Sequence, residues 1–200
     1  MTILITGAIL SIVAAALFLA PTKVSAHCDT MDGPTAIDGK KALEIGNINY
    51  AFKWIFPEHE NELKEIFEKT LKVRKLGKDA QELADRYFLE NLVRLHRAGE
   101  GAPFIGLKPS GIPIDEKIAA ADKSIEVGNL TPLKGVLSDE EIHALEGKFK
   151  KAMSLIDYDV NDLSAAREYV EAYVSFFKMA EGEDHDHGHH EQNHEHGHSH

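Results

Sequence analysis

One short stretch near the N-terminus combines the donor types that bind transition metals. His27, Cys28, Asp29 and Asp32 offer an imidazole, a thiol and two carboxylates within residues 27–33, here called the hook. If the chain is cut after Ala26, His27 also gains a free α-amine. That amine, with a pKa of about 8, and the thiol, with a pKa of about 8.5, both lose their protons readily to a bound cation. Because the intervening amide nitrogen can complete a chelate ring, the hook is a candidate metal site.

The segment before the hook predicts export. Residues 3–20 are almost wholly apolar and are followed by Ser25 and Ala26, small residues of the kind found at signal-peptide cleavage sites. We therefore predict that residues 1–26 are a signal peptide and that the mature chain is periplasmic or extracellular. The alternative is an uncleaved membrane anchor, since about 18 apolar residues can just span a bilayer. After cleavage we expect no membrane contact.

The other end of the chain is also rich in metal-binding side chains. Residues 181–200 interleave histidines with Asp, Glu and Gly, a composition that predicts a disordered tail. Imidazoles at this spacing bind Ni, Cu or Zn ions at overlapping sites with little selectivity, because no geometry is enforced. A solvated tail without metal is the alternative. The predicted tail ligands are His185, His187, His189, His190, His194, His196, His198 and His200.

Charge and cysteine content narrow the choice of partners. The formal net charge of the 200-residue chain is -11, and it becomes -12 without residues 1–26, which contain one Lys and no acid. Such a chain repels nucleic acid and attracts cations, so we expect metal ions as partners and no nucleic acid. Cys28 has no intramolecular partner and must be a metal ligand, a reactive thiol or half of an intermolecular bridge. The sequence does not fix the oligomeric state.

The spacing of apolar residues predicts an all-α bundle of about six helices over residues 27–180. Helices are expected over 35–46 and 48–56, and helical periodicity is clear over 63–77 and 79–98, without an alternating strand pattern. Four glycines and three prolines between 99 and 114 predict a connector rather than a regular helix.

An internal repeat divides the predicted bundle into two three-helix halves, 35–98 and 115–180. Residues 41–48 and 123–130 share the pattern Lys-x-x-Glu-x-Gly-Asn, 82 residues apart, and further apolar positions match at the same offset. Chance agreement is the alternative, because amphipathic helices share a period in any case. The halves differ most in their third helices, and the first of these gives up apolar positions to Asn91 and His96. Such residues either satisfy buried hydrogen bonds or offer a ligand, so His96 is a further candidate ligand.

The hook resembles that of nickel superoxide dismutase, whose mature chain begins His-Cys-Asp and has a second Cys three residues after that Asp, followed by Gly. His27, Cys28, Asp29 and Gly33 keep this pattern, and Asp32 stands in place of the second Cys. The resemblance implies that His27 supplies its amine and an axial imidazole, and that Cys28 supplies its amide nitrogen and thiolate. The chain also resembles a group of exported bacterial or archaeal proteins of unknown function that begin His-Cys-Asp-x-Met-Asp-Gly-Pro.

The missing thiolate decides between binding and catalysis. Two thiolates would bring the reduction potential of a nickel ion into the range that superoxide chemistry needs. One thiolate and a carboxylate suit stable binding of Ni, Zn or Cu instead. We therefore expect an extracytoplasmic protein of metal handling, storage or trafficking. One alternative is a hook-based metalloenzyme, a superoxide-dismutase-like oxidoreductase in which Asp32 or His96 completes the site. The other is a secreted helical module without metal at the hook.

Overall fold

The computed structural model describes residues 27–182, which contain seven α-helices and no strand, and this confirms the predicted all-α class. The predicted signal peptide and the tail histidines lie outside the described residues. Within 27–182, no helix is long and apolar enough to cross a membrane. The helices are α2 (Pro34–Ile45), α3 (Asn49–Phe52), α4 (Glu60–Val73), α5 (Lys78–Gly99), α6 (Glu116–Val127), α7 (Asp139–Ser154) and α8 (Leu163–Glu181). Short 3-10 turns are η1 (His27–Asp29), η2 (Pro57–His59), η3 (Arg74–Leu76) and η4 (Thr131–Leu133).

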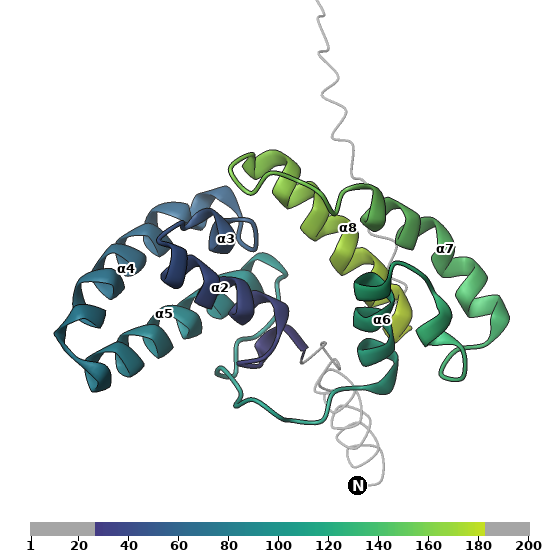
Figure 1. Ribbon diagram of the computed structural model, residues 1–200, viewed down its shortest axis with the longest axis horizontal. Helices are drawn as coiled ribbons and strands as arrows, with labels where there is room; N and C mark the ends of the chain where they lie inside the picture. Colours follow the sequence, from purple (N-terminus) through teal and green to yellow (C-terminus); the bar gives the residue numbers. More distant parts are fainter. Residues whose placement is uncertain (1–26, 183–200) are drawn as a thin grey trace, which may run out of the picture.

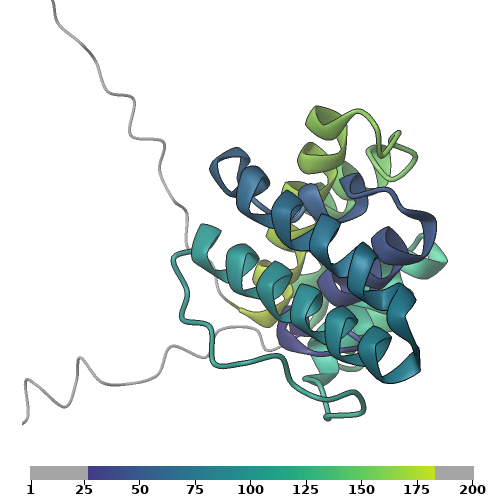
Figure 2. The same ribbon diagram turned by 90° about the vertical axis from the view of Figure 1, so that its left-hand side faces the viewer.

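The helices form two lobes that lie side by side (Figure 1). The N-terminal lobe consists of α2 to α5 and the C-terminal lobe of α6 to α8. In each lobe the last helix, α5 or α8, packs against both the first helix of that lobe and the helix before it. Figure 2 shows α4 and α5 running along one side of the molecule, with the connector on the outside. The start of the described chain lies between the lobes.

Two pairs of residues 82 positions apart have similar local roles in the two lobes. Helices α2 and α6 both end at a glycine in the left-handed conformation, Gly46 with φ 76° and Gly128 with φ 72°. Buried residues of the two helices also match, as with Leu43 and Ile125. At these positions α2 and α6 therefore use matching residues in the same way: one pair ends the helix and the other is buried.

The helix predicted over 48–56 is shorter than expected and extends only over α3. Proline disfavours a helical conformation in the residue before it, and Phe56, just before Pro57, is accordingly extended with φ -72° and ψ 153°. The chain turns between α3 and Pro57 and buries Trp54 and Ile55. This turn brings Trp54 to the lobe interface.

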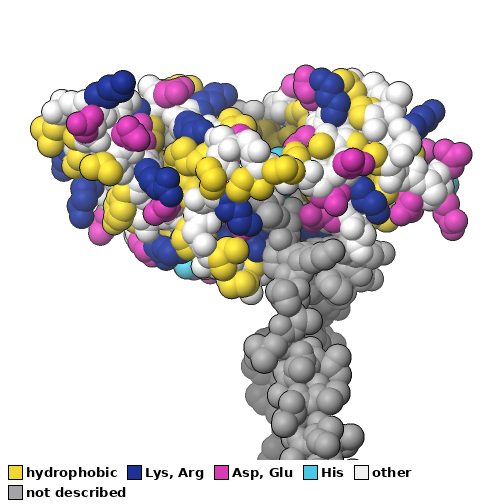
Figure 3. Space-filling model, turned by 90° about the horizontal axis from the view of Figure 1, so that it is seen from below, with side chains coloured by type: hydrophobic (Ala, Val, Ile, Leu, Met, Phe, Trp, Pro, Cys, Tyr) yellow, Lys and Arg dark blue, Asp and Glu magenta, His cyan; other side chains and the backbone are white. Residues whose placement is uncertain are grey.

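The connector, residues 100–115, holds the hook against the N-terminal lobe. The N–H of Met31 donates to the Lys108 carbonyl at 2.9 Å, and the N–H of Lys108 donates to the Asp29 carbonyl at 2.8 Å. Leu107 is buried, whereas Ile105 is exposed. Seen from below, acidic and basic side chains are interspersed over both lobes, with hydrophobic side chains between them (Figure 3). The acidic net charge is therefore not gathered into one patch on this face.

Candidate metal centre at the lobe interface

The hook folds back on itself before α2 begins. The N–H of Gly33 donates to the Thr30 carbonyl at 3.0 Å, and the Thr30 hydroxyl donates to the His27 carbonyl at 3.2 Å. Gly33 lies so close to the His27 carbonyl oxygen that a Cβ at this position would overlap it. Pro34 then starts α2, where its missing N–H costs no helical hydrogen bond. Glycine at 33 is therefore required by the close approach of the two backbone segments.

His27 ties the hook to the C-terminal lobe. Its Nε2 lies 2.6 Å from Asp122 Oδ2 on α6, and the other oxygen of Asp122 accepts a hydrogen bond from the Tyr173 hydroxyl at 2.9 Å. The imidazole also stacks on Phe177 of α8, with ring centroids 6.0 Å apart and planes 8° from parallel. Only 10% of the His27 side chain is exposed. The first residue of the hook is thus held by one carboxylate and one aromatic face.

Asp29 ties the hook to the N-terminal lobe. It is buried, and its Oδ1 lies 3.5 Å from Nε of Arg97 on α5. Arg97 in turn donates to Glu100 at 2.8 Å, and Lys178 of α8 lies 3.2 Å from the other Glu100 oxygen. Burial raises the pKa of Asp29, while the positive charge of Arg97 opposes this shift. A chain of alternating charges therefore runs from the hook across the lobe interface.

The Cys28 thiol lies between these two anchors. Burial and then the negative charge of Glu100 raise its pKa to about 12, so the thiol is protonated at neutral pH. Tyr173 is close enough for the Cys28 charge to act on its pKa, which burial raises well above the usual value. The Cys28 residue is half-buried, and a protonated thiol is a far weaker nucleophile than a thiolate. A metal ion that binds Cys28 must displace the proton.

His96 presents an unused lone pair in the same region. Its Nδ1 lies 2.8 Å from the carbonyl oxygen of Trp54, which can only accept, so Nδ1 carries the hydrogen. Its buried Nε2 has no hydrogen-bond partner and lies 3.8 Å from Glu100. Burial lowers the His96 pKa, which keeps the ring neutral. A neutral imidazole whose Nδ1–H is fixed by a carbonyl is the form that ligates metals through Nε2.

The remaining predicted ligands do not complete a cluster of side chains. Asp32 is exposed, and its Oδ2 accepts a hydrogen bond from the Gly111 N–H at 2.8 Å. Within residues 27–182, no three side chains of His, Cys, Asp or Glu are grouped closely enough to hold a metal ion. A metal at the hook would therefore need main-chain nitrogens as well as side chains.

Three residues of this interface escaped the sequence prediction: Glu100, Asp122 and Tyr173. Charged residues on an amphipathic helix are usually solvated, so nothing in the pattern distinguished Asp122 from its neighbours. Tyr173 lies on the apolar face of α8, where an aromatic residue is expected for packing alone. Contacts between distant segments, and not local spacing, give these residues their place at the site.

One family matches most of the chain but not the first residues of the hook. A family described as a family of unknown function, DUF6448, matches residues 32–179. The chain belongs to the DUF6448 family. The matched range includes Asp32 and His96 and stops short of His27 and Cys28, so membership of DUF6448 carries no information about the two principal hook ligands. No curated protein and no solved structure matches the chain.

Proposed function

We propose that this DUF6448 protein is an extracytoplasmic metal-binding protein that holds one Ni, Cu or Zn ion at the hook of the mature chain. The observation that carries the proposal is the free Nε2 of His96, a buried neutral donor in the same region of the lobe interface as the half-buried Cys28 thiol. Glu100 acts on the pKa of both His96 and Cys28, so the two donors share one region of the lobe interface. The proposal depends on cleavage before His27, which would supply the α-amine.

The donor geometry of the hook favours a chelate. Amine nitrogen, Cys28 amide nitrogen and Cys28 sulfur are each separated by two atoms along the chain, so a metal bound to all three closes two five-membered rings. Ni(II) and Cu(II) favour such planar nitrogen and sulfur sets, whereas Zn(II) favours a tetrahedral set. The imidazole of either His27 or His96 is available as a further ligand.

The charges at the interface support a bound cation. Three carboxylates lie here with two permanent side-chain cations: Arg97 contacts Asp29 and Glu100, and Lys178 contacts Glu100, while Asp122 contacts His27. The carboxylates therefore outnumber these cations by one, which favours a bound cation over a bound anion.

The tail has a separate role in this proposal. Eight closely spaced histidines would collect ions with little selectivity, while the hook would hold one ion in a fixed geometry. Storage or trafficking fits this division better than redox catalysis, since the hook has a single sulfur.

A titration of the mature chain with Ni(II) or Cu(II) tests the proposal. Protein that starts at His27 and lacks residues 183–200 is expected to bind one tight equivalent and to develop a thiolate-to-metal charge-transfer band. Cys28→Ser should abolish the band, because a neutral hydroxyl is a far poorer ligand than a thiolate. His96→Gln should weaken binding with the band retained.

Two matched proteins complete the experiment. Asp32→Asn changes a hook carboxylate that is already engaged by Gly111 and should bind metal as the unchanged chain does. A chain with one extra alanine before His27 moves the amine away and should lose the tight equivalent. If the tail-less mature chain binds no metal at all, the hook is not a metal site.

A further inference from the structure

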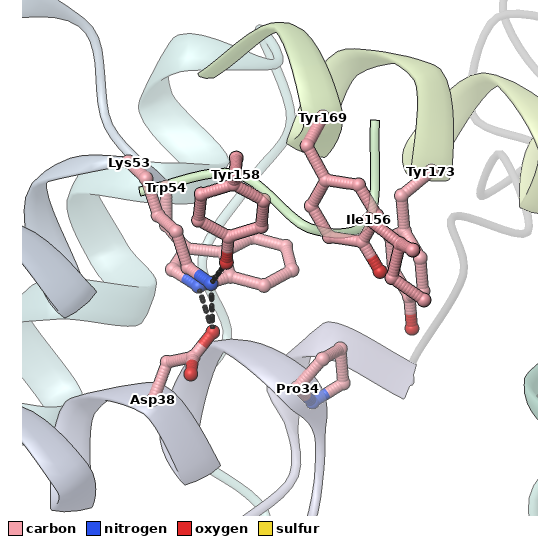
Figure 4. A pocket seen from close by; sticks show the side chains of 8 residues that line it. All are labelled: Pro34, Asp38, Lys53, Trp54, Ile156, Tyr158, Tyr169 and Tyr173. Atoms are coloured by element: carbon pink, nitrogen blue, oxygen red, sulfur yellow. Dashed lines mark hydrogen bonds and ion pairs between the residues drawn. The ribbon is translucent and has the colours of Figure 1, made fainter. Parts of the chain in front are cut away.

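A cavity at the lobe interface is lined by none of the residues proposed to bind the metal ion. It has a volume of about 290 Å³ and is lined by Pro34, Asp38, Lys53, Trp54, Ile156, Tyr158, Tyr169 and Tyr173 (Figure 4). The N-terminal lobe supplies the lining residues from α2 and from the turn after α3. The C-terminal lobe supplies those from α8 and from the loop before it. Trp54 and Tyr173 separate this cavity from the hook, because each also contacts a residue of the candidate metal centre.

The walls of the cavity are aromatic faces and edges. Tyr158 and Tyr169 stack with centroids 4.9 Å apart, and Trp54 meets Tyr173 edge-on at 6.1 Å. Figure 4 shows the tyrosine rings along one side, with Pro34 opposite them. Such surfaces bind flat molecules well, because planar ligands stack on or abut aromatic rings over a large area. Shape therefore favours a planar ligand.

The charges inside the cavity already cancel. Lys53 is 5% exposed and lies 2.7 Å from Asp38 Oδ2, which also accepts a hydrogen bond from Trp54 Nε1 at 2.8 Å. The Lys53 ammonium further sits over the Trp54 and Tyr158 rings, 5.5 and 5.1 Å from their centroids. This aromatic cage thus holds a cation of the chain itself. A charged ligand would meet either Lys53 or Asp38 as a like charge and lose its own hydration, so an uncharged ligand is favoured.

Hydrogen-bonding capacity remains unused beside this ion pair. Both interactions of Asp38 go to Oδ2, and among the described residues no hydrogen bond reaches Oδ1. The Tyr158 hydroxyl accepts from Lys53 and keeps its own hydrogen free to donate. The Tyr169 hydroxyl makes no hydrogen bond within residues 27–182, and burial raises its pKa to about 12, so it stays protonated. One acceptor and two hydroxyl donors are therefore available to a ligand.

We propose that this cavity binds a small, uncharged, planar molecule that carries both a hydrogen-bond donor and an acceptor, such as a primary amide on an aromatic ring. The donor of the ligand faces Asp38 Oδ1 and its acceptor takes a hydrogen bond from the Tyr169 hydroxyl. This proposal is independent of metal binding, because none of the metal ligands lines the cavity.

Trp54 provides the test, since it is the only tryptophan of the chain and forms part of the wall. Nicotinamide and benzamide are the probes, and nicotinate is the charged counterpart of nearly the same shape. Full-length protein titrated with either amide should show saturable quenching of Trp54 fluorescence, confirmed by calorimetry. Nicotinate should bind at least tenfold more weakly. Equal binding of nicotinate, or no saturable binding of either amide at millimolar concentration, would overturn the proposal.

Two tyrosine variants locate the binding. Tyr169→Phe keeps the ring and removes one donor, so amide affinity should fall about three- to tenfold, as expected for one neutral hydrogen bond. Tyr87→Phe makes the same change on the exposed face of α5 and should leave affinity unchanged. Circular dichroism checks that both variants stay folded. Unchanged affinity in folded Tyr169→Phe would overturn the assigned site. The metal titration of the hook is a separate readout, so failure here leaves the metal proposal standing.

Discussion

The two lobes share one helical plan and differ in what their last helices present to the interface. At matching positions 82 residues apart, α5 carries His96 and Arg97 where α8 carries Lys178 and Met179. Both α5 residues are buried, and with Glu100 they contact the hook or lie near it. Helix α8 instead offers Tyr173 and Phe177, which form an aromatic wall. Helix α5 thus supplies buried ionisable groups, whereas α8 supplies an aromatic surface together with one half-exposed cation, Lys178.

This difference shows how a repeated fold can acquire a site. A buried arginine in α5 is tolerated only because the hook brings Asp29 to it and the end of the helix brings Glu100. The matching place in α8 has no such partners and holds methionine. Substitutions at positions that differ between the two lobes test this interpretation.

The largest effect is expected from Arg97→Met, which gives α5 the residue of α8. It leaves two carboxylates, Asp29 and Glu100, without the buried cation that pairs them. Removing one partner of a buried ion pair costs about 3 to 5 kcal/mol, so a loss of this size is expected in the free energy of unfolding by denaturant. Lys178→Met removes the half-exposed cation from the same Glu100 and should cost about 1 kcal/mol or less. Equal losses would show that Arg97 has no special role.

A second difference concerns how closely the first helix packs in each lobe. Gly39 of α2 matches Ala121 of α6, and a Cβ at Gly39 would lie 2.6 Å from Leu89 Cδ2 and 2.8 Å from Leu92 Cδ2. Gly39→Ala should destabilise the protein by about 1 to 2 kcal/mol, because overpacking outweighs the gain in helix propensity. Gly147→Ala, on an open face of α7, should instead stabilise it by up to about 1 kcal/mol. Stabilisation by both substitutions, measured by thermal or denaturant unfolding, would contradict the closer packing of α2.

The third prediction tests whether Glu100 contributes to the raised pKa of the thiol. Its matching position in the other lobe is Gly182, which has no charge. Glu100→Gln should lower the Cys28 pKa from about 12 but leave it raised, because burial is the larger cause of the shift. Below that pKa, alkylation by iodoacetamide follows the thiolate fraction, so the rate should rise. Glu58→Gln, away from the hook, is the control and should leave the rate unchanged. A rate unaffected by Glu100→Gln would show that the charge does not reach the thiol.

The sequence predicted the architecture far better than the site, and the reason is physical. Helical class, the connector and the matching glycines Gly46 and Gly128 follow from local spacing and backbone preference, which act over a few residues. His96 was found because a polar residue at an apolar position is locally visible. Asp122 and Tyr173 were not predicted, because Asp122 matters through its contact with His27, and Tyr173 through its contacts with Asp122 and Trp54. The cavity beside Lys53 was missed for the same reason.

The smallest effect is expected from His96, whose counterpart Lys178 lies partly in solvent. Burial lowers the His96 pKa below its usual value of 6.5, so at acidic pH the unfolded chain takes up a proton that the folded chain does not. His96 therefore contributes full stability above about pH 6.5, and this contribution falls with pH by up to about 1.4 kcal/mol per unit until the lower folded-state pKa is reached. The charges of Glu100, Asp29 and Arg97 also act on the His96 pKa. The pH profile of the unchanged chain is therefore compared with that of a variant that differs only at His96. His96→Gln replaces the imidazole with a group that does not titrate, and it should flatten the decline in unfolding free energy between pH 7 and 5 while lowering stability at pH 7.

His143→Gln, on the exposed face of α7, removes a solvated imidazole and should leave the pH profile as it is. If the unfolding free energy of His96→Gln declines between pH 7 and 5 as in the unchanged chain, another group causes the decline. That result would contradict a buried, neutral His96 that is able to bind a metal through Nε2.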